Sequence, residues 1–282
     1  ACLLGRSSVG AVVPEPLGFG PAVHRAGAIG RVHHYRKTGN DQVLGVHGEA
    51  EALGHRLWVD EVLQETAAQI PGITAGQLRA ALDSGAVQPR YRPEGNDSWE
   101  GLLFPAKYFI EEDITPEEVL AKMSNEFAKV TGELGYGAAE RSLGLSAYDV
   151  IIVASLIEAE AKTDADRPKI ARVIYNRLAE GISLGIDATL IYENGVRGEV
   201  PTAAQLADPT PYNTRHPEIT GLPPTPIAAP GRASLEAAMN PTPGPWLFYV
   251  LIDNEGNHAF AVTNAEHEEN KAIADELGLL DG

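Results

Sequence analysis

A long apolar run, AYDVIIVASLIEAEAK, predicts a helix that protein surrounds on nearly all sides. At about 100° per residue its apolar side chains cover most of the helix circumference. Ser146, followed three residues later by Asp149, is a capping-box signature for the start of this helix. Only a narrow sector is polar, and in it Ser155, Glu158 and Lys162 follow one another at steps of three and four residues.

Similar spacing predicts further helices within HRLWVDEVLQETAAQI, TAGQLRAALDSGAV and DRPKIARVIYNRLAEG. Another helix is predicted after Thr115, with Pro116 in its first position and Glu118 completing a capping box. Short apolar runs predict strands around residues 102–109 and within ISLGIDATLIYENG, and a hairpin in PWLFYVLIDNEGNHAFAVT. Residues 208–244, rich in proline and glycine, are predicted to form a long functional loop. We therefore expect an α+β fold of mixed helices and short antiparallel strands.

The first 48 residues differ in composition from the rest of the chain. They hold five basic and two acidic residues, a net charge of +3. Because the whole chain has a net charge of −17, the remaining residues carry −20. No helical or strand period is sustained there, so this segment is predicted to be an irregular tail. His33, His34 and His47 suggest a metal site, but no carboxylate or cysteine stands at ligand spacing, and a loose tail is the favoured interpretation.

The net charge of −17 argues against a nucleic acid partner, which would be repelled. Cys2 is the one cysteine, which excludes an intrachain disulfide and a CxxC centre. No apolar run reaches the roughly 20 residues of a membrane span. The chain begins with Ala1 instead of Met, and we expect an upstream segment, such as a membrane anchor, to be missing.

Glu158 is the main candidate for chemistry. In an apolar wall, desolvation would raise the pKa of its carboxyl group, as a general acid working near neutral pH requires. Glu160 is expected to point to the far side of the helix, with Val153 and Leu156. From the pattern alone, however, the favoured interpretation is that Glu158 is a buried structural carboxylate paired with Lys162.

Five segments, taken together, resemble the YceG-like (MltG) family of endolytic murein transglycosylases. They are VASLIEAEAKTDADRPKIARVIYNRLAEGISLGIDATLIYENG, DPTPYNT, ITGLPPTPIAAPG, HAFAVTNAEHEEN, and upstream EGLLFPAKYFI with TPEEVLAKM. The resemblance implies that the first glutamate of the AS-V/I-E-x-E motif, here Glu158, is the catalytic acid. It also implies cleavage of the β-1,4 bond between N-acetylmuramic acid and N-acetylglucosamine within peptidoglycan strands, giving 1,6-anhydro ends. The attacking group is then the sugar's own C6 hydroxyl, so one carboxylate suffices and no metal or other cofactor is implied.

The resemblance further implies a set of substrate-binding residues: Asp187, Thr189, Tyr192, Tyr212, Asn213 and Thr214. We hypothesise that the amide of Asn213 and the hydroxyls of Thr189 and Tyr212 bond the N-acetyl and hydroxyl groups of the sugars.

Other positions that match the family are expected to be structural. Asn176 and Arg177 sit in the middle of a predicted helix and are expected to cap a neighbouring loop. His258 and His267 are expected to form structural hydrogen bonds. Gly185 departs from the family, which has a glutamine there, so a substrate-binding amide is absent from this chain.

By this resemblance the chain divides into an irregular tail (1–48), a truncated LysM-like subdomain (49–90) and a YceG-like catalytic domain (91–282). The full-length protein is expected at the extracytoplasmic face of the cytoplasmic membrane, held by an N-terminal anchor. Its expected partners are peptidoglycan glycan strands and penicillin-binding synthases. Two alternatives stay open: a two-carboxylate muramidase-type hydrolase in which Asp187 or Glu160 activates water, and a non-catalytic glycan-binding or cell-wall assembly module.

Overall fold

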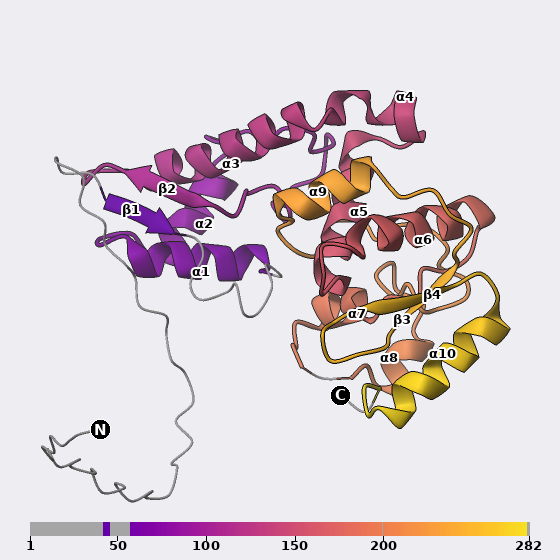
Figure 1. Ribbon diagram of the computed structural model, residues 1–282. Coiled ribbons are helices and arrows are strands. Elements are labelled where there is room, and N and C mark those ends of the chain that lie inside the picture. The colour runs from indigo at the N-terminus through magenta and orange to yellow at the C-terminus, as the bar shows by residue number, and fades with distance from the viewer. Residues whose placement is uncertain (1–41, 46–56, 199, 281–282) are drawn as a thin grey trace, which may run out of the picture. The chain divides into compact units, whose positions relative to one another are not determined.

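The computed structural model describes residues 42–45, 57–198 and 200–280 (Figure 1). Cys2 and the histidines considered for a metal site, His33, His34 and His47, lie outside these residues. The described part of the tail is not irregular, because Gln42–Gly45 forms strand β1. This strand pairs antiparallel with β2 (Lys107–Ile110), and Gln42 lies opposite Ile110.

Three helices accompany this small sheet: α1 (Val59–Gln69), α2 (Ala75–Asp83) and α3 (Pro116–Glu133). Helix α2 packs against both α1 and α3. The start of α3 confirms the prediction, since Thr115 caps the helix and accepts a hydrogen bond from the backbone of Glu118. Strand β2 is shorter than predicted, because residues 102–106 form turns and loop whose apolar side chains fill the core.

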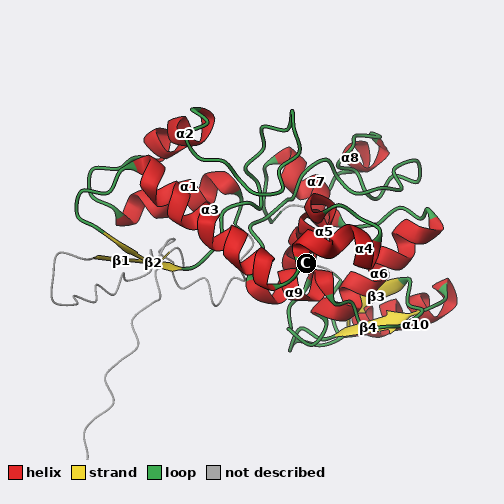
Figure 2. Ribbon diagram, turned by 90° about the horizontal axis from the view of Figure 1, so that it is seen from above, coloured by secondary structure: helices red, strands yellow, loops and turns green. Residues whose placement is uncertain are grey.

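Helix α5 (Ala147–Glu160) lies at the centre of the next group of elements. It packs against α6 (Arg167–Glu180), α7 (Asp187–Asn194) and α9 (Arg232–Met239), as the views of Figures 1 and 2 both show. Every residue from 150 to 158 is buried, which confirms that this helix is enclosed on all sides. The short η1 (Tyr136–Ala138) and α4 (Ala139–Leu143) precede it, and α8 (Ala203–Ala207) follows α7.

The predicted C-terminal hairpin is confirmed. Strands β3 (Phe248–Leu251) and β4 (His258–Ala261) pair antiparallel, with Leu251 opposite His258. The chain turns at Gly256, whose φ is +92°. Helix α10 (Asn264–Glu276) then packs against both strands.

Two predictions about secondary structure are wrong. The strand expected within ISLGIDATLIYENG is helix α7, which packs against α5 and ends at Gly195 with φ +69°. Local β propensity is a weak preference that tertiary packing overrides. The predicted long loop also contains a helix, α9, which α5 and α6 cover.

The α+β class is confirmed by these mixed helices and two-stranded antiparallel sheets. Within the described segments, no single helix has both the length and the apolar character needed to cross a membrane. Tyr136–Leu143 and Ala147–Glu160 meet that test of length and composition only as a pair, with a bend of 93° between them.

Candidate active site

The last turn of α5 points three consecutive residues, Glu158, Ala159 and Glu160, toward three different surroundings. Glu158 contacts the segment before α9, Ala159 lines a pocket, and Glu160 contacts strand β3. This follows from helix geometry, because successive side chains are about 100° apart. The helix ends at once after this turn, at Ala161.

Glu158 is buried, with 2% of its surface exposed. Its Oε2 accepts a hydrogen bond from the backbone N–H of Gly231 at 3.0 Å and lies 3.4 Å from Nη1 of Arg167. That guanidinium also bonds the hydroxyl of Ser234 and, at 2.9 Å, the carboxylate of Asp164. The carboxylate of Glu158 is therefore held between a backbone amide and a cation.

The predicted polar sector of α5 exists, but the chain itself fills it. Ser155 accepts from the backbone N–H of Ile227 at 3.0 Å, and Glu158 accepts from Gly231, so the loop before α9 lies along the sector. In this conformation Glu158 is covered by that loop and does not meet a cleft. The expected pairing with Lys162 is wrong, since Lys162 is exposed and Glu158 forms its ion pair with Arg167. Periodicity gives a side chain's direction on the helix but not what occupies the space it points into.

Glu160 is partly exposed and accepts a hydrogen bond from the hydroxyl of Tyr249, on β3, at 2.9 Å. Burial and the negative charge of Glu160 raise the pKa of Tyr249 well above its ordinary value. The phenol therefore stays protonated and can donate to the carboxylate.

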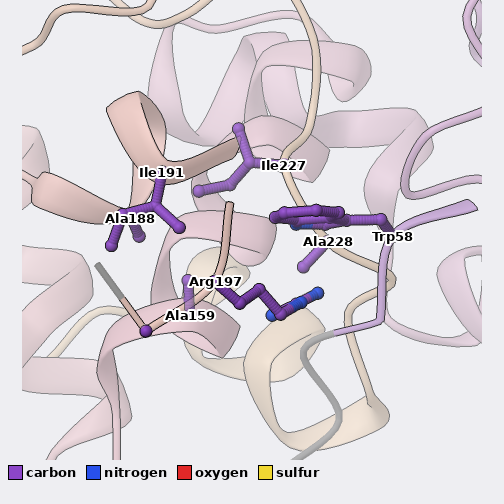
Figure 3. Close-up of a pocket in the computed structure, with 8 residues that line it drawn as sticks. Trp58, Ala159, Ala188, Ile191, Arg197, Ile227 and Ala228 are labelled. Atoms are coloured by element: carbon purple, nitrogen blue, oxygen red, sulfur yellow. The ribbon is translucent and has the colours of Figure 1, made fainter. Parts of the chain in front are cut away.

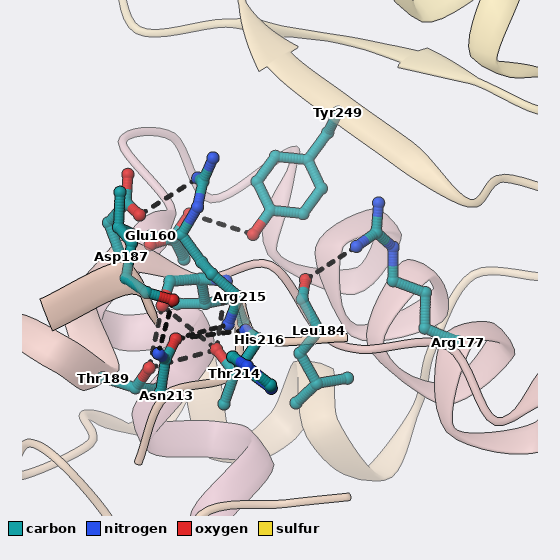
Figure 4. Close-up of polar contacts among 12 residues, drawn as sticks. Glu160, Arg177, Leu184, Asp187, Thr189, Asn213, Thr214, Arg215, His216 and Tyr249 are labelled. Carbon is teal, nitrogen blue, oxygen red and sulfur yellow. Dashed lines mark hydrogen bonds and ion pairs between the residues drawn. The ribbon is translucent and has the colours of Figure 1, made fainter. Parts of the chain in front are cut away.

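Asp187 lies close to this pair, at the start of α7. Its side chain is about half exposed, and its Oδ1 lies 3.0 Å from Nη1 of Arg215. Figure 4 shows Glu160, Asp187, Arg215 and Tyr249 gathered at one place, coming from α5, α7, the loop after α8 and β3. We call these four residues the carboxylate cluster.

Three of the predicted substrate ligands lie inside the protein instead: Thr189, Asn213 and Thr214 are each 0% exposed. Thr189 donates to the carbonyl of Ile186 at 2.8 Å and lies 3.0 Å from the hydroxyl of Thr214. The hydroxyl of Thr214 accepts from the backbone N–H of Ile186 at 3.1 Å. These hydroxyls fix the start of α7, and hence Asp187, and no sugar can reach them in this conformation.

The amide of Asn213 is fully used by the backbone around it. Its Nδ2 donates to three carbonyls of α8 and the residue after it, at 3.0, 3.1 and 2.7 Å. Its Oδ1 accepts from the backbone N–H groups of Arg215 and His216. The expected contact with sugar therefore does not fit this placement, and Asn213 shapes the loop that carries Arg215.

Tyr192 and Tyr212 form part of an aromatic row. The rings of Trp58 and Tyr192 meet edge to face at 5.8 Å, and those of Tyr192 and Tyr212 are 5.5 Å apart. The hydroxyl of Tyr212 lies 2.7 Å from that of Thr225. Both tyrosines are partly exposed.

Glu100 is hydrogen-bonded to Tyr192 of this row, and the sequence did not single it out. It is 1% exposed, and both of its carboxylate oxygens accept from the backbone N–H of Val59, at 3.1 and 3.0 Å. Burial raises the pKa of Glu100 to about 7, although hydrogen bonds from Val59 and Tyr192 oppose the rise. The signal available in the sequence was its place in the segment EGLLFPAKYFI, which carries part of the family resemblance.

A pocket of about 150 Å³ lies beside Ala159 (Figure 3). It is lined by Trp58, Ala159, Ala188, Ile191, Arg197, Gly198, Ile227 and Ala228. The guanidinium of Arg197 lies 4.1 Å from the centre of an indole ring of Trp58 and pairs with Glu61 at 2.6 Å. Trp58 and Arg197 were not singled out by the sequence reasoning, because they are far apart in the chain.

The structural roles predicted for Asn176 and Arg177 are confirmed. Asn176 donates to the carbonyls of Gly244 and Trp246, and Arg177 donates to three carbonyls, among them Leu184 at 2.9 Å. Gly185 has φ +71°, and a Cβ there would lie 2.9 Å from Nη1 of Arg177. This chain therefore needs glycine at that position.

The two histidines that match the family, His258 and His267, differ in their surroundings. His258 contacts the carboxylate of the buried Asp166 through its backbone N–H, at 2.8 Å, and through Nδ1, at 3.1 Å, which confirms a structural hydrogen bond. His267 instead stacks on Phe248 at 5.0 Å, and among the residues that the structure describes its Nδ1 has no hydrogen-bond partner. The prediction of a structural hydrogen bond is therefore wrong for Nδ1 of His267.

Comparison with known proteins places these features in context. The sequence model of the YceG-like family matches residues 48–273. An endolytic murein transglycosylase of Bacillus subtilis is 36% identical over 176 residues, which are 61% of this chain and 47% of that protein. One from Streptococcus pneumoniae R6 is 31% identical over 229 residues, 79% of this chain and 39% of that protein. The chain thus spans about half or less of these curated relatives.

A solved structure is similar as well. The crystal structure of a YceG-like protein from Listeria monocytogenes superposes with a TM-score of 0.64 at 26% identity. The match covers 76% of this chain and 73% of the other.

Proposed function

We propose, since this chain belongs to the YceG-like family, that it is an endolytic peptidoglycan lytic transglycosylase. Its reaction is cleavage of the β-1,4 bond between N-acetylmuramic acid and N-acetylglucosamine inside glycan strands, leaving 1,6-anhydro ends. The names of the relatives from Bacillus subtilis and Streptococcus pneumoniae support the reaction class. The observation that carries the proposal in this chain is Glu158, the first glutamate of the family motif, which lies in the last turn of α5 beside Arg167.

We assign the proton donor to Glu158, the first glutamate of the family motif. A general acid must come within hydrogen-bond reach of the oxygen that it protonates. Glu158 is 2% exposed and contacts Gly231 and Arg167, so a glycan can reach it only when the loop before α9 moves aside. Glu160 then has a positioning role: it holds strand β3 to the end of α5 through Tyr249.

Glu160 is the competing assignment. It is partly exposed and accepts a hydrogen bond from Tyr249, so it could meet a ligand without movement of the loop before α9.

In the proposed reaction Glu158, in its acid form, protonates the bridging oxygen as the bond to the muramic acid C1 breaks. The resulting carboxylate takes the proton of the C6 hydroxyl as that oxygen bonds to C1. The carboxyl group is thereby restored to its acid form, and no water is consumed. The C6 hydroxyl is tethered to the reacting ring, which favours its attack over that of water. The guanidinium of Arg167, 3.4 Å from Oε2 of Glu158, stabilises the carboxylate form between the two steps.

Asp187 gives the hydrolase alternative a physical basis. It is about half exposed and lies in the same cluster as Glu160. A second carboxylate near the acid could activate water, as in inverting glycosidases. Its ion pair with Arg215 argues for a binding or positioning role instead.

Digestion of purified peptidoglycan tests these assignments together. The wild type should release fragments with 1,6-anhydro ends, detected by mass spectrometry as products one water lighter than hydrolysis products. Glu158→Gln should abolish release if it remains folded, while Glu160→Gln should keep measurable activity. Loss of activity in folded Glu160→Gln with activity kept in Glu158→Gln would reverse the assignment. Reducing ends would favour the hydrolase, and no release from any folded form would favour a non-catalytic module.

The cellular setting is also part of the proposal. Residues 49–90, with helices α1 and α2, would be the remaining part of a LysM-like subdomain, and residues 91–282 the catalytic domain. The whole protein would act at the extracytoplasmic face of the cytoplasmic membrane, beside penicillin-binding synthases, on new glycan strands. Crosslinking in cells that carry the full-length protein tests this setting, and an absence of synthases among the crosslinked proteins would count against it.

A further inference from the structure

Arg167 occupies a position that its own helix does not favour. It is the first residue of α6, where the partial positive charge of the helix N-terminus repels a cation. Its side chain is nevertheless only 13% exposed, and Nη1 lies 3.4 Å from Oε2 of Glu158. Contacts outside α6 must therefore hold the guanidinium in this place.

Two of its nitrogens are held by side chains. Nε donates to Oδ1 of Asp164 at 2.9 Å, and Nη1 donates to the hydroxyl of Ser234. Nη1 carries two hydrogens, so Ser234 takes one and leaves the other for Oε2 of Glu158. Because the guanidinium is planar and rigid, fixing Nε and Nη1 sets the direction of that second N–H group.

The two anchors differ in strength. The side chain of Asp164 is 83% exposed, and an ion pair at such a position contributes little because water and salt screen it. Ser234 is 0% exposed, and a hydrogen bond to a charged group is stronger inside a protein than at its surface. A buried hydroxyl without a partner would be costly, and Arg167 is the partner that the structure gives it. Ser234 is therefore the main anchor of the guanidinium.

Ser234 belongs to helix α9 and not to the loop that covers Glu158. Gly231 is the N-cap of α9, whereas Ser234 lies inside its first turn. Helix α9 packs against both α5 and α6. Movement of the loop before α9, which the proposed reaction requires, can take the N–H of Gly231 away from Glu158. The hydrogen bond of Ser234 does not depend on that loop, so the cation stays beside the carboxylate.

We propose that Ser234 is a positioning residue for the proton donor Glu158 and acts through the guanidinium of Arg167. This inference rests on the proposed function, because it takes Glu158 to be the group that exchanges a proton with the glycan. As Glu158 gives up its proton, negative charge develops on its carboxylate. An N–H group that already points at Oε2 stabilises this charge without reorganisation. Since Ser234 is buried, it acts on the rate of the chemical step and not on substrate binding.

Steady-state kinetics separate these two effects, with a soluble, peptide-free oligosaccharide of alternating N-acetylglucosamine and N-acetylmuramic acid as substrate. Ser234→Ala should lower kcat by about tenfold, as expected for loss of a hydrogen bond to a charged group, and leave KM unchanged. Ser124→Ala, at a buried serine of α3, is the matched control and should keep both constants. Ser234→Cys, a similar side chain with a weaker acceptor, provides a second variant should Ser234→Ala fail to fold, and it should also lower kcat. Asp164→Asn should lower kcat less than Ser234→Ala.

The same substitution in Arg167→Lys distinguishes positioning from a merely structural role. Lysine keeps a cation near Glu158, but its ammonium has no plane that must be oriented. Ser234→Ala should therefore lower kcat by a smaller factor in Arg167→Lys than in the wild type. A structural defect that does not act through the guanidinium would lower kcat by the same factor in both proteins.

Full kcat in folded Ser234→Ala, a change confined to KM, or an equal loss of kcat in both backgrounds would overturn the proposal. A larger loss in Asp164→Asn than in Ser234→Ala would overturn it as well, since the surface pair would then hold the guanidinium. Failure of the proposed function is a separate result, seen as no glycan cleavage by the wild type or as full activity of Glu158→Gln. Cleavage that needs Glu158 but not Ser234 would refute the positioning role alone.

Discussion

Glu100 makes the unfolding free energy of this protein depend on pH in a direction that can be worked out. Burial raises the pKa of its carboxyl group from the ordinary value of 4.5 to about 7 in the folded protein. Between those values the folded state binds more protons than the unfolded state, so the unfolding free energy falls as pH rises. Below about pH 4.5 both states are protonated and the group contributes no pH dependence. Each pKa unit is worth about 1.4 kcal/mol, so the full loss is about 3 kcal/mol.

Glu100→Gln removes this loss. The amide oxygen of glutamine can still accept from the backbone N–H of Val59, and the side chain is neutral at every pH. We expect the variant to gain about 3 kcal/mol relative to the wild type between about pH 4.5 and pH 8. Urea unfolding of both proteins at the two pH values measures how the difference in unfolding free energy between variant and wild type changes with pH. Since each comparison is made at one pH, the titration of other groups cancels.

Glu112→Gln is the matched control, because it removes one carboxylate from an exposed turn before α3. Its stability relative to the wild type should change little between the two pH values. The reasoning is refuted if Glu100→Gln shows the same stability difference from the wild type at both pH values. That outcome would mean that water or the neighbouring donors keep Glu100 ionised in the folded protein.

Three further substitutions test the contacts around the site. Arg167→Met should lower the unfolding free energy by about 3 kcal/mol, because the buried Glu158 loses its cation. Adding Glu158→Gln should restore most of this loss, and no recovery would mean that the ion pair is unimportant. Gly185→Ala should cost about 1–2 kcal/mol, because its backbone is left-handed with φ +71°; an unchanged melting temperature would contradict this strain. Asn213→Ala should lower the unfolding free energy by about 2 kcal/mol or more, since five backbone groups lose their partner. A variant of full stability that is defective only in glycan binding would instead show that Asn213 is a sugar ligand.

Features encoded by nearby residues could be predicted from the sequence. The capping boxes at Thr115 and Ser146 involve residues three positions apart, so both helix starts were found. The enclosed character of α5 followed from apolar residues on all of its sides. Helix α7 was missed because its segment is rich in residues that suit a strand, and packing against α5 decided the outcome.

Features that depend on distant residues could not be predicted. Whether Glu158 or Glu160 meets solvent depends on Gly231 and Tyr249, which lie more than 70 residues away in the chain. The sequence gives the angle between the two glutamates but not which side the loop before α9 covers. Likewise, the contact of Glu100 with Val59 joins residues 41 positions apart. No local pattern marks such a pair.

Because Glu158, Ala159 and Glu160 each need a different surrounding, the number of residues in α5 cannot change. Deleting one residue ahead of Glu158 would turn the last turn by about 100° relative to the core. A methyl group would then face Tyr249, and a carboxylate would face the indole of Trp58. Both ends of the helix are fixed, by Ser146 and by the break at Ala161. Insertions and deletions should therefore accumulate in the connecting loops of this chain and be excluded from α5.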